Sequence, residues 1–282
     1  MSVMTAQRLR RVAETDAHEG PVYVADEDAL YFTTVRREGV AIKRLALADG
    51  TVTVVRADAN VANGMALDRE GCLVVCEQGT LTEPARITRI DRATGNAETL
   101  VDSAAGLRLN SPNDVVVKGD GTIWFTDPSY GHLQGFRPEP QTGDHVYRYD
   151  PASGELTAVL GSLDKPNGLA FSPDERVLYI GDNGAPHHLL AFDMEGGARL
   201  AGGRVLADFT PEQPDGIKVD ERGRIYASAA GGVRILDERG GQIGEIELPG
   251  AVNFAFGGPG RNVLFITTDT AVWAAELDTK GA

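Results

Sequence analysis

Cysteine is nearly absent from this 282-residue chain, which contains only Cys72 and Cys76. The two lie four residues apart in one expected strand, where side chains at that spacing share a face. We predict buried free thiols in a reducing compartment, rather than a disulfide or a zinc site. Long apolar runs are also absent, and the first residues lack the apolar core of a signal peptide. The sequence therefore predicts a soluble, cytoplasmic protein that does not enter a membrane.

Basic residues are in the minority: 27 Lys and Arg face 41 Asp and Glu, which gives a formal net charge of −14. Phosphate backbones are bound by clustered Lys and Arg, so nucleic acid is excluded as an expected partner. Most of the acidity is typical of a solvated surface, which leaves a minority of carboxylates for a metal. No G-x-S-x-G elbow, phosphate loop or dinucleotide fingerprint occurs, so covalent serine catalysis and nicotinamide chemistry have no support.

Sustained helical periodicity is missing as well, and 34 glycines and 14 prolines are spread along the chain. Instead, one pattern recurs roughly every 40–50 residues: a polar residue, an apolar strand, a tight turn and a second, half-buried strand. Repeats of this length with about four strands each are typical of propeller blades. The sequence predicts an all-β, six-bladed propeller of four antiparallel strands per blade, as a single domain over residues 1–282. Residues 7–13 are expected to complete the last blade beside residues 271–277.

Each repeat begins with a short polar side chain, and we call these six the ring residues: Glu19, Asn63, Asn113, Asn167, Asp215 and Asn253. The innermost strands of a propeller line its channel, so equivalent positions converge there. Two carboxylates balance a divalent cation, and an all-oxygen set favours Ca²⁺ or Mg²⁺ over zinc. Asn-Gly and Asp-Gly are also common turn dipeptides, which is the alternative for each single pair.

Other polar positions lie near the expected channel mouth. Asp127 and Asp182 either cap turns there or support the metal ligands from behind. Two longer insertions, residues 77–85 and 129–143, follow strands that end at the same face and are candidate lids or pocket walls. His132 in the second insertion is a candidate for substrate contact.

The chain resembles the SMP-30/gluconolactonase/luciferin-regenerating-enzyme family of calcium-dependent six-bladed propellers, and its bacterial gluconolactonase branch most. The similarity runs from about Glu19 to Ala227, and the segments that carry it are Glu19-Gly20-Pro21-Val22-Tyr23, Asn110-Ser111-Pro112-Asn113-Asp114, residues 122–131, Lys165-Pro166-Asn167-Gly168 and Pro214-Asp215-Gly216-Ile217. The resemblance implies metal ligation by Glu19, Asn167 and Asp215, with Asn113 as a further ligand or as a residue that holds the metal-bound substrate. It also implies that Asp215 is the general base. The animal branch has an arginine where this chain has Ser111, so recognition of a sugar lactone by that arginine does not transfer.

The leading hypothesis is a lactonase that opens a small lactone, a sugar lactone such as gluconolactone first of all. One divalent cation, Ca²⁺ before Mg²⁺, Mn²⁺ or Zn²⁺, polarises the carbonyl while Asp215 assists the attack of water. Substrate contacts are assigned to Asn113, Ser111, Asn63, His132 and Asn253. Two alternatives stay open: a fluorophosphate or phosphotriester hydrolase with Asp215 as nucleophile, and a ligand-binding propeller without catalysis. A monomer or weak homodimer is expected.

Overall fold

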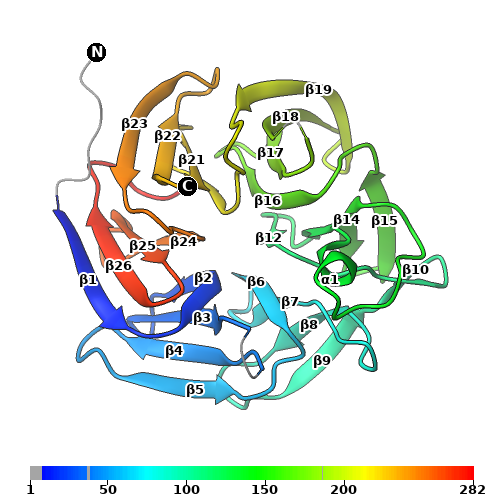
Figure 1. Cartoon of the computed structure of the whole chain (residues 1–282), viewed down its shortest axis with the longest axis horizontal. Helices are drawn as coiled ribbons and strands as arrows, with labels where there is room; N and C mark the ends of the chain where they lie inside the picture. The colour runs from blue at the N-terminus through cyan, green and yellow to red at the C-terminus, as the bar shows by residue number, and fades with distance from the viewer. Residues whose placement is uncertain (1–7, 37–38, 186) are drawn as a thin grey trace.

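The computed structural model forms six four-stranded antiparallel sheets around a central axis, as Figure 1 shows. The structure describes residues 8–36, 39–185 and 187–282. The predicted all-β, six-bladed propeller is confirmed. In the described residues the single helix is the short α1 (Tyr130–Leu133), in agreement with the missing helical periodicity.

The blades follow one another along the chain, and each runs outward from the axis. Blade one is β2 (Ala17–Val24), β3 (Ala29–Thr34), β4 (Ile42–Ala46) and β5 (Val52–Arg56). Blade two is β6 (Ala62–Leu67), β7 (Leu73–Glu77), β8 (Arg86–Ile90) and β9 (Ala97–Val101). Blade three is β12 (Val115–Val117), β13 (Ile123–Asp127), β14 (His145–Asp150) and β15 (Glu155–Leu160).

Blade four is β16 (Pro166–Phe171), β17 (Val177–Asp182), β18 (His188–Glu195) and β19 (Arg199–Asp208). Blade five is β20 (Ile217–Val219), β21 (Ile225–Ala229), β22 (Gly232–Leu236) and β23 (Gln242–Glu247). Blade six is β24 (Phe254–Gly257), β25 (Val263–Thr267), β26 (Ala271–Glu276) and β1 (Arg8–Glu14). A separate hairpin, β10 (Ser103–Ala104) with β11 (Leu107–Arg108), follows blade two.

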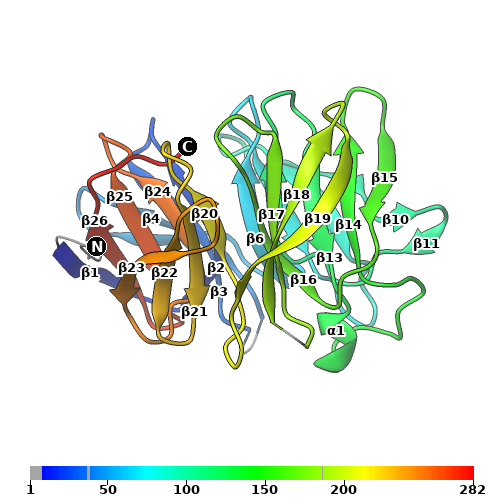
Figure 2. The same ribbon diagram turned by 90° about the horizontal axis from the view of Figure 1, so that it is seen from above.

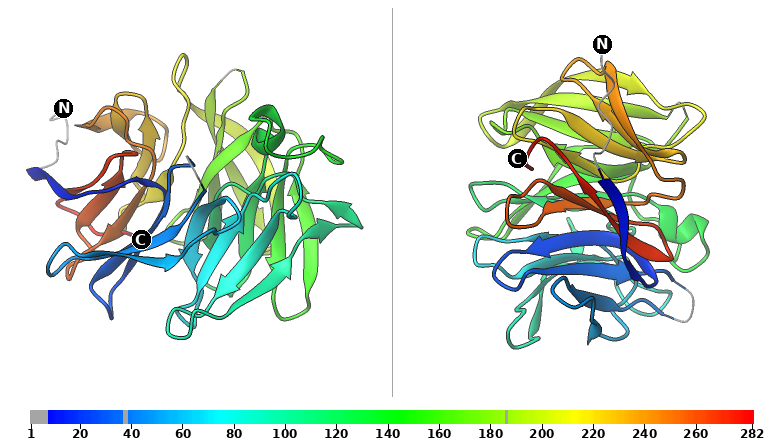
Figure 3. Two further views of the ribbon diagram at one scale, coloured as in Figure 1. Left: turned by 60° about the horizontal axis from the view of Figure 1, so that its bottom comes forward. Right: turned by 90° about the vertical axis from the view of Figure 1, so that its left-hand side faces the viewer.

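The ring of blades is closed by the two ends of the described chain. The first strand, β1, pairs antiparallel with β26, and Figure 3 shows the dark-blue strand lying against the red one. The predicted closure beside residues 271–277 is thus confirmed, while Gln7 lies outside the described residues. Because β1 covers the outer edge of β26, that edge is paired within the molecule.

Apolar side chains are buried between neighbouring blades. One cluster joins Tyr31 and Ile42 of blade one to Leu73 and Val75 of blade two. Every residue of β3, β7, β13 and β21 is buried. The half-buried second strands expected from the sequence are therefore wrong for these blades, because packing against both neighbours covers both faces of the strand.

The two faces of the disc differ. In Figure 2, α1 lies at one face and the C-terminus lies at the other. The predicted free and buried thiols are confirmed, since Cys72 and Cys76 are both buried and form no disulfide. Within the described residues, no helix has the length and apolar character needed to cross a membrane.

Candidate functional site

A cavity of about 270 Å³ opens at the end of the channel that α1 adjoins. Five of the six ring residues line it: Glu19, Asn63, Asn113, Asn167 and Asp215. Both insertions contribute to its wall, as predicted, through Gln78 from the first and Tyr130 and Gln134 from the second. The structure therefore brings together residues that are far apart in the sequence.

The ring residues face the cavity because the regular pairing of the inner strand with its neighbour is interrupted, or has not yet begun, at each of them. The register of β2 shifts on both sides of Glu19, and the ladders of β6 and β16 shift across Asn63 and Asn167. In blades three and five the inner strand begins only after the ring residue. Such irregularities release a strand from strict alternation, so a side chain can be aimed at a site.

The glycine that follows a ring residue is a point of contact with the next blade. Gly64 lies within β6 and Gly168 within β16, so neither pair is the corner of a turn. A Cβ on Gly64 would lie 2.6 Å from the carbonyl oxygen of Asn113, and a Cβ on Gly168 would overlap that of Asp215. Glycine is required here because two backbones approach each other closely.

Buried hydroxyl groups on the second strands connect each of these positions to the next blade. Thr33 donates a hydrogen bond to the carbonyl oxygen of Asn63, and Thr126 donates one to that of Asn167. Ser228 and Thr267 donate in the same way to the carbonyl oxygens just before Asn253 and Glu19. The Thr and Ser at the ends of otherwise apolar strands were the signal for these bonds in the sequence.

Glu19 and Asp215 form the negative centre of the cavity. Burial raises the pKa of Asp215 well above its usual value, and the charge of Glu19 raises it further. Burial also raises the pKa of Glu19, whose Oε2 accepts hydrogen bonds from Gly20 N at 3.0 Å and Asn253 Nδ2 at 2.8 Å. Two neighbouring carboxylates in a poorly solvated site are stabilised by a cation between them.

The remaining oxygen atoms of the ring fit a divalent cation. The Oδ1 atom of Asn167 is buried and has no hydrogen-bond partner in the structure, although a buried amide oxygen normally has one. No group of three or more His, Cys, Asp and Glu side chains in the described chain is placed to hold a metal, so a site here depends on amides as well as carboxylates. Carboxylate and amide oxygens are the ligands that Ca²⁺ and Mg²⁺ prefer.

His18 also lines the cavity, although the sequence gave no reason to select it. Its Nδ1 lies 2.6 Å from Asp269 Oδ1. Burial lowers the pKa of His18, but the bond to Asp269 and the charge of Glu19 outweigh this and raise the pKa above its usual value. His18 and Glu19 both face the site because the β2 ladder is interrupted between Ala17 and Glu19.

The sequence profile of the "SMP-30/Gluconolactonase/LRE-like region" matches residues 17–270. The chain belongs to this family. It is 32% identical over 234 residues to a gluconolactonase from Zymomonas mobilis, covering 78% of this chain and 64% of that protein. It is 28% identical over 304 residues to the lactonohydrolase oryL from Aspergillus oryzae, covering 95% and 70% of the two chains. A solved gluconolactonase from Xanthomonas campestris is 37% identical with a TM-score of 0.86, covering 96% and 89%.

The chain thus spans less than two thirds of the Zymomonas family member. Three of the residues predicted from the sequence to contact substrate lie away from the cavity. Asn253 is 1% exposed and holds Glu19 instead of lining the wall. Ser111 is fully buried, where its Oγ donates to Pro128 O at 2.6 Å and accepts from Gly131 N at 2.9 Å. His132 is exposed on α1 and is not among the lining residues.

Asp127 and Asp182 both organise loops. Asp127 is fully buried and accepts hydrogen bonds from the backbone N–H groups of Asn110 and Ser111, while burial raises its pKa to about 7. Asp182 accepts hydrogen bonds from Asp164 N and Gly184 N. Asp127 therefore shapes the segment that leads to Asn113, while its support of the metal ligands stays a prediction.

Arg137 is a structural residue of the site that the sequence did not reveal. Its guanidinium is buried and donates to four carbonyl oxygens, those of Leu109, Asn110, Thr80 and Glu83, at 2.8–3.0 Å. These oxygens belong to the first insertion and to the segment before Asn113. Arg137 thus fastens both to the second insertion, where α1 presents Tyr130 to the cavity.

Proposed function

We propose that this cavity hydrolyses a lactone, with one divalent cation held by Glu19, Asn113, Asn167 and Asp215. The observation that carries the proposal is the pair of enclosed carboxylates beside an unpartnered amide oxygen at a polar cavity. Relatives named gluconolactonase and lactonohydrolase support it. Ca²⁺ is the expected ion, because a ring of protein oxygens suits its large, flexible coordination shell.

When bound, the cation supplies Lewis acidity that polarises the ester carbonyl and stabilises the oxyanion. Asp215 accepts a proton from the attacking water, whose oxygen bonds to the carbonyl carbon. The bond to the ring oxygen then breaks, and the proton passes from Asp215 to that oxygen to give a hydroxy acid. With a cation bound beside it, Asp215 would have a lower pKa than in its absence, and its carboxylate would be available as a base near neutral pH.

The wall of the cavity suits a substrate with several hydroxyl groups. Around the carboxylates it is lined by side chains that donate and accept hydrogen bonds: His18, Asn63, Gln78, Tyr130, Gln134, Asn183 and Gln213. A few convergent polar groups orient a small ligand, and this number of them favours a sugar lactone such as gluconolactone over an aliphatic one.

Proton release from a panel of sugar and aliphatic lactones, with and without chelator, tests the proposal directly. We expect turnover that is abolished by the chelator, restored by Ca²⁺ and faster for the sugar lactones. Turnover that survives complete removal of the metal would contradict the cation-dependent mechanism. The proposal as a whole fails if no lactone reacts in the presence of Ca²⁺, Mg²⁺, Mn²⁺ or Zn²⁺, and a binding role would then explain the cavity better.

Replacing the proposed base gives a second test. Asp215→Asn keeps the size of the side chain but removes the proton acceptor, so turnover should fall to background. Asp193→Asn is the control, because Asp193 is exposed on β18 and pairs with Arg204 far from the ring. Near-normal turnover in Asp215→Asn would remove this residue from the chemistry.

A further inference from the structure

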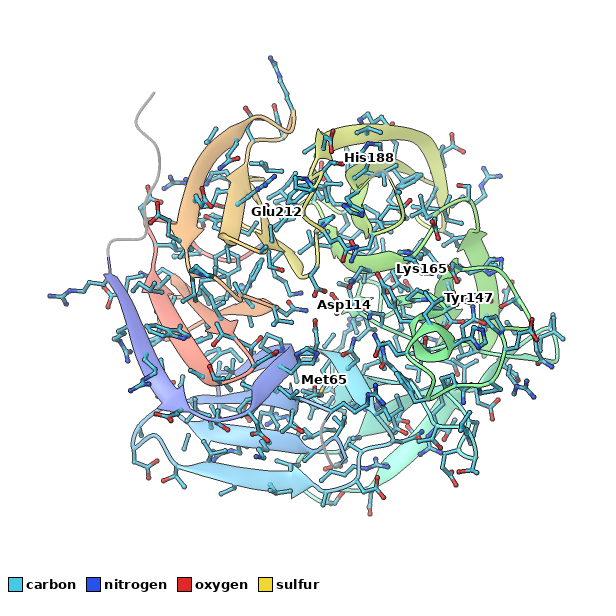
Figure 4. The ribbon with its side chains drawn as sticks, viewed as in Figure 1. Met65, Asp114, Tyr147, Lys165, His188 and Glu212 are labelled. Carbon is cyan, nitrogen blue, oxygen red and sulfur yellow. The ribbon has the colours of Figure 1, made fainter. Side chains whose placement is uncertain are left out.

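A third carboxylate, that of Asp114, lies in the channel behind the two carboxylates of the ring. Figure 4 shows it beside the central opening. Asp114 is 2% exposed, and its Oδ1 accepts a hydrogen bond from Val115 N at 2.9 Å. Its Oδ2 is buried without any hydrogen-bond partner. The absence of a side chain on Gly64 makes room for it, since a Cβ there would lie 2.6 Å from Oδ1.

The position of Asp114, directly after the proposed ligand Asn113 and against Gly64, brings its charge next to the ring. When all three are ionised, Asp114 together with Glu19 and Asp215 brings the formal charge at this end of the channel to three negative units. One divalent cation would leave such a group negatively charged and buried, which is costly in a poorly solvated channel.

Lys218 provides the compensating charge from the opposite side. It lies on β20, three residues after Asp215, and its Nζ is 3.9 Å from Asp114 Oδ2. The same Nζ donates a hydrogen bond to Ile217 O at 3.1 Å. Lys218 also lines a mostly apolar cavity of about 380 Å³ at the far mouth of the channel.

We propose that Lys218 is a fixed counter-ion that sets the charge of the metal centre to two negative units and so matches it to one divalent cation. The inference depends on the proposed cation at the ring, and it goes beyond that proposal by assigning charge selectivity to a residue that touches neither cation nor substrate.

The decisive measurement is cation binding rather than activity. Wild-type protein and Lys218→Met are titrated with Ca²⁺ by calorimetry and with Tb³⁺ by luminescence, after removal of bound metal. Asp215 and Lys218 are three residues apart, which in an extended chain puts their Cα atoms roughly 10 Å apart, and we take this as the separation of the two charges. At that distance, removing one positive charge should tighten binding on the order of tenfold per unit of cation charge. We therefore expect a gain for Ca²⁺ and a larger gain for Tb³⁺.

The charge argument also predicts effects of opposite sign. Asp114→Asn should weaken Ca²⁺ binding, because it removes a negative charge. The double variant, Asp114→Asn with Lys218→Met, should return towards the wild-type affinity. If the ion pair were merely structural, both single variants would bind Ca²⁺ more weakly. Lys218→Arg should behave like the wild type. Lys118→Met is the matched control, because Lys118 is also largely buried but pairs with Asp120 and Glu175.

Unchanged or weaker Ca²⁺ binding in Lys218→Met would overturn the inference, as would equal gains for Ca²⁺ and Tb³⁺. Lys218→Gln, which also removes the charge, decides the matter if the methionine variant does not fold. The two proposals fail in different ways. A wild-type protein that binds no cation refutes both, whereas a wild-type protein that binds Ca²⁺ without any response to Lys218 refutes only the counter-ion.

Discussion

Replacing Gly64 with alanine should disturb the proposed metal centre without replacing any of its ligands. The new Cβ would lie 2.6 Å from Asn113 O, from the Cα of Asp114 and from Asp114 Oδ1, whereas ordinary contact begins at 3.4 Å. The first two of these atoms are backbone, and Gly64 N also donates a hydrogen bond to Asn113 O at 2.8 Å. Blade three must therefore move away from blade two by nearly 1 Å at the ring, which is the difference between the 2.6 Å contact and the 3.4 Å at which ordinary contact begins.

The magnitude follows from two opposing effects. Insertion of a methyl group into a packed region typically costs about 1–3 kcal/mol of unfolding free energy. The lower entropy of the unfolded alanine variant returns about 0.4–1 kcal/mol. A net loss of about 1–2 kcal/mol should lower the melting temperature by roughly 2–8 °C in a protein of this size. Because a displacement near 1 Å can cost about 100-fold in rate, kcat/KM should fall by about one to two orders of magnitude.

Thermal unfolding, Ca²⁺ titration and lactone turnover are measured on the same samples. Gly231→Ala is the control, because its Cβ would lie 3.5 Å from Glu245 Oε1, at ordinary contact distance. Its melting temperature should stay level or rise slightly, and its turnover should not change. If Gly64→Ala matches this control in stability and in turnover, close backbone contact between blades does not position the ring, and the reasoning is refuted.

Three further changes test other contacts of the site. Asn253→Leu removes the donor to Glu19 Oε2, so calorimetry should show Ca²⁺ affinity about 10–100-fold lower; unchanged affinity would mean that this bond does not orient Glu19. Arg137→Met leaves four buried carbonyl oxygens without their donor and should lower the unfolding free energy by at least about 1–3 kcal/mol, while the exposed Arg176→Met should not. Asp127 has its pKa raised from 3.8 to about 7, so the folded protein retains a proton that the unfolded chain releases between these pH values. The difference in unfolding free energy between the wild type and Asp127→Asn, measured by urea titration, should therefore fall by on the order of 4 kcal/mol as pH rises from about 4 to 7. A difference that does not change with pH would contradict the raised pKa.

The sequence was sufficient for the architecture because each blade repeats the same order of polar residue, strand and turn. The phase of that repeat also placed Glu19, Asn113, Asn167 and Asp215 at one end of the channel, and the cavity contains all four. What the repeat could not give was the direction of each neighbouring side chain. His18 should have pointed away from Glu19 by strict alternation, but the irregular ladder of β2 brings both to the cavity.

Other features depended on tertiary packing alone. An arginine in a polar insertion is ordinarily solvated, and only the approach of two other loops makes Arg137 a buried donor. Asp114 occupies the place that glycine takes in the Asn63-Gly64 and Asn167-Gly168 pairs. The repeat therefore indicated a backbone role for this position and gave no sign of a functional carboxylate. Ser111 and His132 lie in loops, where spacing does not determine which face of the segment meets the cavity.

The closure of blade six has a consequence for how the protein is made. Glu19 is held by Asn253, 234 residues later, and the strand before Glu19 pairs with β26. During synthesis the earlier blades can form as they emerge, but β1 stays unpaired and the proposed cation site stays open until the last blade is made. Contacts between such distant residues slow the final step of folding. Until translation reaches β26, the nascent chain is an open arc in which the proposed cation site is incomplete.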